Sequence, residues 1–534
     1  MTPVAGWQRT CAGVTLLICL SPCRQALGQV PAARTDSAPI VQAIEIRRAP
    51  VFNAVEEQFW GFRLLNTLHA ETRPYVIRRE LLISSGAPWD TALVNESERN
   101  LRALGIFRDV QIDSVRTDSG LIARVRTVDA WTTSIGVGLT TSGSQYVLDL
   151  SLQELNLLGT RTAALLAYRN DPDRTAVGVG FDTPRALWAQ IGVGASYVDR
   201  SDGRAAAVSL RQPFYSLSAR RGGSLQGQYL DGRVLRYAGG TGSPVDSMRR
   251  RYELIRVDGA YAATAGTRGF LRLGLLAQLR REDFGPEGGT APIPRTLTSA
   301  AGPTLALRRP RFIRVRNVES TDRIEDIDLG LAVQAEVLLA PSAWGYERTG
   351  LGGSLGVTLG QPLPMGFART RLNAGALQTA EGTDSSVVEV AASLVLQPAA
   401  QHLFVAFAGG GMRRNPAFGT EYDLGLSYGL RAFPAHAFTG DRHYLVSAEY
   451  RWLFLPRFLE LLTVGGAVFA DHGGAWFDGS ARRSGTDAGI GLRLSSIREA
   501  GGVWRLDLSR RSGDSAIEAG WVFSIGRGFV FGRV

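Results

Sequence analysis

The chain has 534 residues, of which 59 are basic and 49 acidic, and its formal net charge is +10. Every basic residue is arginine, and the arginines are interleaved with Asp and Glu without a dense basic run, which argues against nucleic-acid binding. All three cysteines lie within the first 28 residues, so a chain without that segment has neither disulfides nor thiolate metal ligands.

Residues 1–28 have the pattern of a secretory signal peptide. A charged start precedes the apolar run Ala12–Leu20, and small residues before Gln29 predict cleavage there. A membrane anchor is the alternative, but the apolar run is too short to cross roughly 30 Å of hydrocarbon. The segment Leu20–Cys23 resembles a lipoprotein cleavage box, although its proline argues against that interpretation.

Residues 29–39 are expected to form a linker, and residues 40–131 a small α/β module. The apolar periods predict the order strand, helix, helix, strand, strand. The expected strands cover 40–46, 110–115 and 121–126, and the expected helices cover 76–82 and 91–104. Residues 52–69 are an additional aromatic-rich stretch, for which we expect a short extra helix.

From residue 132 onward, apolar and polar residues alternate with the period of two that is typical of strands with one apolar face. The clearest alternation runs through 146–153, 271–280, 327–337, 443–452, 504–509 and 517–525. A soluble β-sandwich would also alternate. The sequence favours a membrane barrel instead, because it shows no helical period and places full charges on the polar face. Tyr450, Trp452 and Trp521 also lie near strand ends, where interfacial aromatic residues gather.

Lipid requires such a sheet to close, because an open edge leaves backbone groups without hydrogen-bond partners. We therefore predict an all-β membrane protein with an antiparallel transmembrane β-barrel over residues 132–534. The chain has somewhat more than about 16 alternating segments. We assign the segments beyond that number to hairpins in long extracellular loops. We expect these hairpins near 238–246 and 284–294, and further long loops at 308–326 and 413–442.

Two short motifs in the C-terminal part carry opposite charges. The first is a loop with Gly429, Leu430, Arg431, Ala432 and Phe433 in sequence. The second runs from Phe469 through Asp471 to Gly473, at the end of an apolar strand. An arginine and an aspartate so placed indicate a salt bridge inside the barrel. The alternative is that Arg431 is one of many solvated arginines in the lumen.

These features resemble the BamA/TamA (Omp85-type) superfamily of outer-membrane assembly factors and two-partner secretion transporters. The resemblance covers nearly the whole mature chain. In the module it lies in Gly86 and in Asn100–Phe107, and near the first barrel hairpins in Glu154–Thr160 and Phe181–Arg185. It implies a C-terminal barrel of 16 strands preceded by one POTRA domain at residues 40–131.

The resemblance also implies a role for the two motifs. The family's loop tip has the pattern V/L-R-G-F/Y, and its arginine pairs with the aspartate of an F-x-D-x-G strand, which here implies the pair Arg431–Asp471. Ala432 replaces the usual glycine of the tip, which could stiffen the tip or change its turn. A C-terminal strand signal is expected at Gly528, Phe529 and Phe531, although Gly532–Val534 follows the last aromatic residue.

The resemblance implies that the chain is an outer-membrane protein with its POTRA domain in the periplasm. It would assist assembly and insertion of client proteins, with the POTRA domain receiving clients by β-augmentation. Its expected partners are unfolded outer-membrane or secreted polypeptides, the lipid bilayer and accessory envelope proteins, and the barrel is expected to be monomeric. The alternatives are a two-partner-type polypeptide secretion pore and a passive porin-like channel. The 11 residues at 29–39 are too few for the plug helix of a secretion pore.

The sequence offers no catalytic or metal-binding pattern, so we expect neither an enzyme nor a cofactor. No G-x-S-x-G motif is present. Five histidines are present, and their spacing does not match metal-ligand motifs. They are His69, His402, His436, His443 and His472.

Overall fold

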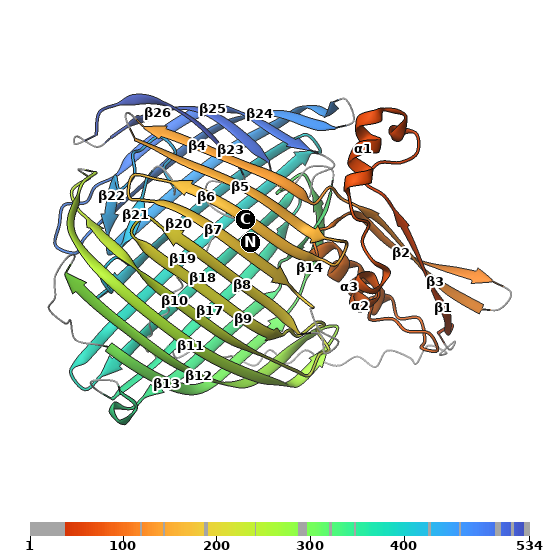
Figure 1. Cartoon of the computed structure of the whole chain (residues 1–534), viewed down its shortest axis with the longest axis horizontal. Coiled ribbons are helices and arrows are strands. Elements are labelled where there is room, and N and C mark those ends of the chain that lie inside the picture. The colour runs from red at the N-terminus through yellow and green to blue at the C-terminus, as the bar shows by residue number, and fades with distance from the viewer. Residues whose placement is uncertain are drawn as a thin grey trace.

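The computed structural model of the chain describes residues 38–117, 120–142, 145–185, 191–240, 242–286, 296–319, 323–345, 349–425, 429–458, 461–496, 503–513 and 517–527. The expected signal peptide and most of the expected linker lie outside these residues. The described residues form a small α/β module at one end of a large β-barrel (Figure 1).

The module has the order of elements that the sequence predicts. Its strands form a three-stranded sheet in the order β1-β3-β2, with β1 parallel and β2 antiparallel to the central strand. The elements are β1 (Val41–Ala49), η1 (Glu56–Gln58), α1 (Trp60–Leu68), α2 (Pro74–Glu80), α3 (Thr91–Ala103), β2 (Phe107–Thr117) and β3 (Gly120–Asp129). Helix α1 is the extra helix expected in residues 52–69.

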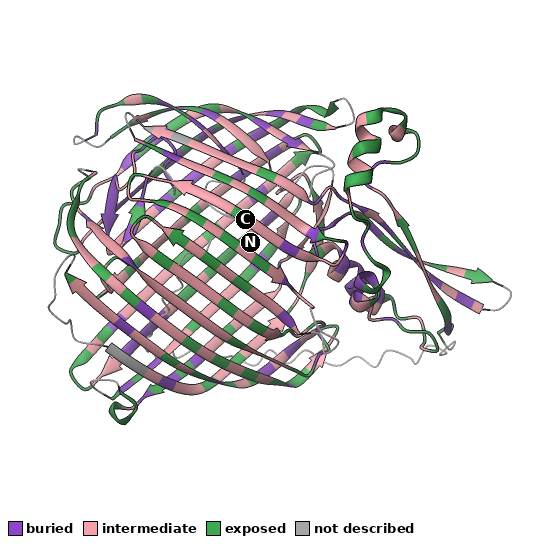
Figure 2. Cartoon of the chain, in the orientation of Figure 1, coloured by how far each residue is buried: buried purple, intermediate pink, exposed green. Residues whose placement is uncertain are grey.

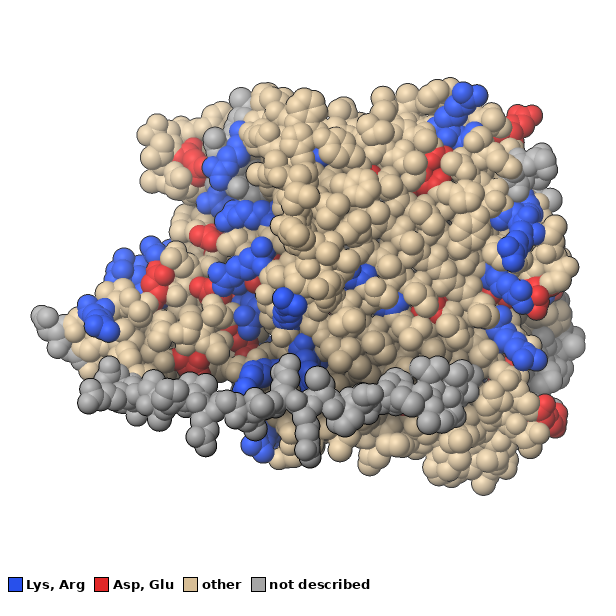
Figure 3. Space-filling view, turned by 180° about the vertical axis from the view of Figure 1, so that it is seen from behind, with Lys and Arg blue, Asp and Glu red and all other residues tan. Residues whose placement is uncertain are grey.

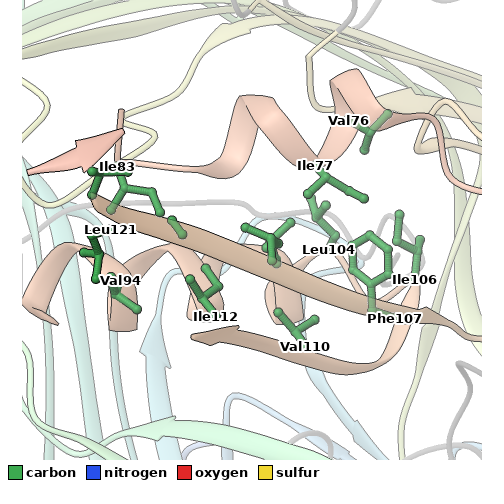
Figure 4. Close-up of a cluster of buried hydrophobic side chains, with 14 residues drawn as sticks. Val76, Ile77, Ile83, Val94, Leu104, Ile106, Phe107, Val110, Ile112 and Leu121 are labelled. Atoms are coloured by element: carbon green, nitrogen blue, oxygen red, sulfur yellow. The ribbon is translucent and has the colours of Figure 1, made fainter. Parts of the chain in front are cut away.

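Local signals explain where the helices of the module begin and end. Asp90 caps α3 by accepting hydrogen bonds from the backbone N–H groups of Ala92 and Leu93. Gly105 turns the chain after α3 with a positive φ of 72°. Helices α2 and α3 cover one face of the sheet, and their apolar side chains form a core with those of the strands (Figure 4).

The second part is a closed barrel of 20 strands in which neighbouring strands are antiparallel. The strands are β4 (Thr133–Ser142), β5 (Gln145–Leu157), β6 (Thr162–Asn170), β7 (Thr175–Thr183), β8 (Gly192–Arg200), β9 (Gly203–Gln212), β10 (Arg221–Tyr237), β11 (Pro244–Gly266), β12 (Gly269–Pro286), β13 (Thr296–Arg309), β16 (Leu331–Ala340), β17 (Gly350–Leu363), β18 (Gly366–Thr379), β19 (Gly382–Ala399), β20 (His402–Arg414), β23 (Arg442–Phe458), β24 (Leu462–Trp476), β25 (Gly485–Ser496), β26 (Trp504–Ser512) and β27 (Gly520–Arg527).

The expectation of 16 strands is therefore wrong. That number came from the resemblance, whereas the alternating pattern itself gave more segments. The surplus segments are wall strands, because a segment with one apolar face buries that face in lipid only when it pairs on both sides. The region 238–246 accordingly contains the start of the wall strand β11, and the described part of 284–294 contains the end of β12.

The outer face of the barrel is apolar. Exposed and less exposed residues alternate along the strands (Figure 2). In β24, Val468 is 59% exposed on the outside, while its neighbour Phe469 is 3% exposed on the inside. The wall seen from behind is a broad, largely uncharged band with charged residues gathered toward both ends (Figure 3). Such a band is typical of a lipid-facing barrel wall.

No helix among the described residues is both long and apolar enough to cross a membrane.

Because neighbouring wall strands are antiparallel, the connections between them lie alternately at the two ends of the barrel. The expected loop 308–326 contains β14 (Phe312–Arg316) and the start of β15 (Ile324–Asp328), which pair as a hairpin at the module end of the barrel. The expected loop 413–442 is at the opposite end and contains the paired short strands β21 (Tyr422–Leu424) and β22 (Phe438–Gly440) (Figure 1). A short helix, η2 (Ser342–Trp344), follows β16.

A charge on the outer face tests this placement. We expect Val468→Arg to lower the free energy of unfolding in a bilayer by about 2–4 kcal/mol, because the arginine would lie in hydrocarbon. The matched control is Val245→Arg at the protruding end of β11, which is equally exposed and is expected to cost about 0–1 kcal/mol. Denaturant unfolding in liposomes measures both values, and equal costs would contradict a lipid-facing wall.

Candidate functional site

The site lies where the loop between β20 and β23 folds into the barrel. Leu430 and Phe433 in this loop are almost completely buried, and they belong to an apolar cluster with wall residues such as Leu445. Gly429 has a positive φ of 86°, which starts the turn of the tip. The loop therefore places its tip against the inner wall of the last strands.

Arg431 is the charged residue at this tip, and its side chain is 1% exposed. Its Nε lies 2.8 Å from a carboxylate oxygen of Asp471, which is the pair implied by the motifs. Its Nη1 lies 2.7 Å from Glu449 and 3.6 Å from Asp507. The guanidinium also stacks on the ring of Phe469, with Cζ 3.8 Å from the ring centroid. The interpretation of Arg431 as a solvated lumen arginine is therefore wrong.

The alternation of side chains along β24 directs the residues of the strand motif toward Arg431. Phe469, Asp471 and Gly473 share the inward face, so the ring and the carboxylate point to the same guanidinium. A Cβ on Gly473 would lie 2.7 Å from the carbonyl oxygen of Tyr444, so a side chain does not fit at that position. His472 points outward, where it contacts Tyr444 on the neighbouring strand.

The pair Arg431–Asp471 is part of a larger cluster of buried charges. Arg493 contacts both Glu449, at 2.9 Å, and Asp507, at 2.6 Å. Arg451 pairs with Glu449, and Arg505 with Asp507. Sequence reasoning missed the partners on β23, β25 and β26. The available signal was the presence of full charges at inward positions of these alternating strands.

Ala432 fits the tip without positive φ. The φ of Ala432 is not positive, so the residue needs none of the conformational freedom of glycine. Its backbone N–H donates to Asp487 at 3.2 Å, and its carbonyl accepts from Arg511 at 2.9 Å. The substitution of glycine by alanine therefore leaves the contacts of the tip intact.

A second contact holds the same loop to the β6–β7 turn. His436 donates from Nδ1 to Asp423, at 2.7 Å, and from Nε2 to Asp173, at 3.0 Å, and its ring stacks on Tyr237. Burial by itself lowers the pKa of His436, but the two carboxylates more than offset it and raise that pKa to about 9. The doubly bonded imidazolium is therefore present at neutral pH, and its stabilisation is lost as the pH rises through about 9.

The two motifs near the first barrel hairpins lie at the junction with the module. Asn156 donates from Nδ2 to Thr72 of the module, at 2.8 Å, and the backbone N–H of Arg73 donates to Gly159. Gly159 has a positive φ of 73°, and a Cβ there would lie 2.2 Å from the carbonyl oxygen of Glu71. Glycine at this turn thus allows the close approach of the module.

Helices α2 and α3 contact further turns on the same side. Arg185 pairs with Glu80 of α2 at 2.8 Å, and burial raises the pKa of Glu80 although Arg185 opposes that rise. Arg102 of α3 makes two hydrogen bonds to Asp326 of the β14–β15 hairpin, at 2.6 and 3.1 Å. The module is therefore held against several turns at the barrel mouth.

The first and last wall strands meet in a short ladder. Among the described residues, β4 and β27 pair at only two positions, Thr140 with Ser524 and Leu139 with Ile525. Other neighbouring strands pair at seven or more positions, as β13 and β16 do. The expected C-terminal signal at Gly528, Phe529 and Phe531 lies outside the described residues.

Among the described residues, no group of three or more His, Cys, Asp or Glu side chains could hold a metal ion.

Replacing Arg431 with an uncharged residue is expected to release the loop from the inner wall. Arg431→Met leaves Glu449, Asp471 and Asp507 buried without their shared cation, and breaking a buried pair costs about 3–5 kcal/mol. The variant should show lower stability to denaturant and faster cleavage of the loop by a protease added to the outside. Because three carboxylates face Arg431, exchanging the charges of Arg431 and Asp471 should restore only part of the loss.

The control for this variant is Arg442→Met. Arg442 pairs with Asp478 at 2.6 Å, but both side chains are substantially exposed, so the expected cost is about 0–1 kcal/mol. An unchanged cleavage rate in Arg431→Met would show that the cluster does not fasten the loop.

The fit of Phe433 against the wall gives a second prediction. A Cβ on Gly485 would lie 2.1 Å from the ring of Phe433, so Gly485→Ala should displace the tip and increase loop cleavage. Phe433→Leu should restore most of the protection in the double variant, because the smaller side chain leaves room for the methyl group. Gly285→Ala, at an open position of β12 with nothing near its ideal Cβ and no positive φ, controls for the general effect of replacing a strand glycine. A double variant cleaved as fast as Gly485→Ala alone would contradict this account.

No family model and no curated protein matches the chain. Solved structures similar to it include BamA from Haemophilus ducreyi lacking POTRA domains 1-3, at 12% identity, covering 92% of this chain and 85% of that chain with a TM-score of 0.38. CdiB from Acinetobacter baumannii has 11% identity, covers 92% and 74%, and has a TM-score of 0.46. CdiB from Escherichia coli has 12% identity, covers 94% and 93%, and has a TM-score of 0.42. The chain is thus similar to BamA and CdiB, the resemblance that its motifs indicate.

Proposed function

We propose that the protein assists the insertion of client proteins into the outer membrane. In this proposal residues 40–131 are a POTRA domain in the periplasm, which receives unfolded polypeptides. The barrel then gives them a route into the bilayer between its first and last strands. Client folding supplies the free energy.

The short ladder between β4 and β27 is the observation that carries this proposal. Two paired positions hold these strands together, supported by a hydrogen bond of 3.0 Å from the Thr141 hydroxyl to the Phe523 carbonyl. By comparison, β26 and β27 pair at eight positions. Among the described residues, separating β4 from β27 breaks fewer backbone pairings than separating any other two neighbouring wall strands, so this is where we propose that a client strand pairs.

The contacts at both ends of the barrel also favour a lateral route. At one end the loop with Arg431 is fastened to the inner wall, and at the other the module is bound to the barrel turns. A client that enters between strands leaves these contacts in place.

The module sheet offers an edge for β-augmentation. In the order β1-β3-β2, the two outer strands each have one side free of the central strand. In the described residues the outer side of β1 is paired only at its start, where Val41 exchanges backbone hydrogen bonds with Gly86 and Ala87. The rest of β1 is the docking edge that we propose, because backbone pairing binds many sequences alike.

Conductance measured beside insertion separates this function from its competitors. A two-partner-type secretion pore or a passive porin-like channel would conduct steadily in planar bilayers. We expect low, flickering conductance together with insertion of a urea-unfolded outer-membrane protein into proteoliposomes. A steady large pore without insertion would contradict the proposal.

A disulfide across the seam tests the route itself. Residues 29–534 contain no cysteine, so Thr140→Cys with Ser524→Cys introduces a single pair in this part of the chain, at opposed backbone positions within disulfide range. We expect the oxidised variant to insert clients no faster than protein-free liposomes, because the seam cannot open. Reduction should restore the rate.

The matched control joins two strands elsewhere in the wall. Val198→Cys with Ala205→Cys links opposed positions of β8 and β9, which already pair at nine positions. This disulfide should leave insertion unchanged. Full activity of the oxidised seam variant would refute a lateral route at this position.

A further inference from the structure

Helix α1 carries an apolar stripe that no part of the described chain covers. Trp60, Leu64 and Leu68 follow one another at intervals of four residues and are 71%, 49% and 69% exposed. Phe59 and Val55, just before the helix, are exposed as well. A soluble module buries such a stripe, so an exposed one indicates a binding surface.

The opposite face of α1 is already used. Phe62 stacks on the buried Phe52, with ring centroids 4.5 Å apart. Asn66 donates to the Phe52 carbonyl at 2.7 Å and accepts from its N–H at 3.2 Å. These contacts fix the rotation of the helix, so the stripe of Trp60, Leu64 and Leu68 faces away from the module as a consequence of the fold.

The place of α1 indicates what covers the stripe. His69, at the end of the helix, contacts the buried Asp129, just before β4. The segment that follows is bound to the β5–β6 turn, where Arg73 donates to the Leu158 carbonyl at 3.1 Å. Figure 1 shows α1 beside the module-side rim of the barrel, set apart from α2 and α3, and Figure 2 shows it largely exposed.

The apolar outer face of the barrel reaches this rim. Ile135 near the start of β4 is 66% exposed, and Leu157 and Leu158 at the end of β5 are 41% and 66% exposed. The rim is where the apolar wall leaves the hydrocarbon, so the membrane surface lies at the height of the segment that follows α1. Helix α1 thus lies close to that surface (Figure 1).

We propose that α1 is an interfacial helix that inserts its apolar stripe into the module-side leaflet of the membrane, beside the seam strand β4. Trp60 and Phe59 suit the headgroup boundary, because aromatic side chains favour that depth. Arg63, exposed on the flank of the stripe, provides a positive charge for lipid phosphates. The occupant of this surface is thus phospholipid, whichever clients the barrel serves.

A fluorescent depth probe tests the proposal in the whole protein. Leu64→Cys gives a single thiol on the stripe, which is labelled with an environment-sensitive dye after reconstitution into nanodiscs of phosphatidylethanolamine and phosphatidylglycerol. We expect quenching by nitroxide-labelled lipids, and quenching by aqueous iodide at least about threefold weaker than at a water-exposed site, because the probe lies among acyl chains.

Two control sites calibrate the probe. Ser114→Cys places it on the exposed part of β2, in the hairpin that points away from the barrel, and Val468→Cys places it on the lipid-facing wall. A probe at Leu64 that iodide quenches as strongly as at Ser114 would overturn the proposal. Protection from both quenchers would overturn it too, because a protein partner or second copy then covers the stripe. The readout is depth alone, so it is independent of insertion activity.

Discussion

The constraint on which the structure depends is that lipid cannot satisfy a backbone hydrogen bond. A sheet in a membrane therefore has to close, and this chain closes with 20 strands. Closure divides the side chains between two solvents, since outward positions meet lipid and inward positions meet a polar lumen. The inward face of β23 to β26 can then carry charged residues that the core of a soluble protein of this size would exclude.

The charges around Arg431 show how such a lumen is organised. Replacing a buried ion pair with apolar residues is often neutral or stabilising, so the cluster is poorly explained by stability alone. Several of its contacts, such as that of Arg493 with Asp507, join residues of different strands, so they depend on the register between strands. One guanidinium that reaches Asp471, Glu449 and Asp507 together can lie in only one place. The cluster therefore specifies the position of the loop.

The sequence predicted the parts of this site that follow from local pattern. The motifs indicated that Asp471 is the partner of Arg431, and the alternation indicated which segments have one apolar face. Glu449 and Asp507 could not be predicted as partners, because the contacts depend on strand register rather than on spacing in the chain. The number of strands was wrong because the resemblance implied 16, and the surplus alternating segments were assigned to loops. Alternation shows that a segment has one apolar face, but it does not show whether that segment pairs into the barrel wall. The direction of the α1 stripe was hidden because it depends on the stack of Phe62 on Phe52.

At the module junction, β4 is bound more strongly to one neighbouring strand than to the other. The chain passes from Asp129, which holds His69 and Thr72, directly into β4. On one side β4 is paired with β5 at ten positions, and Thr132 just before it is bound to Glu154 of β5. On the other side it is paired with β27 at two positions. A displacement of the module that pulls on β4 thus breaks the ladder to β27 before the ladder to β5, since the smaller number of backbone hydrogen bonds yields first. The geometry of the junction therefore directs any such motion to the seam.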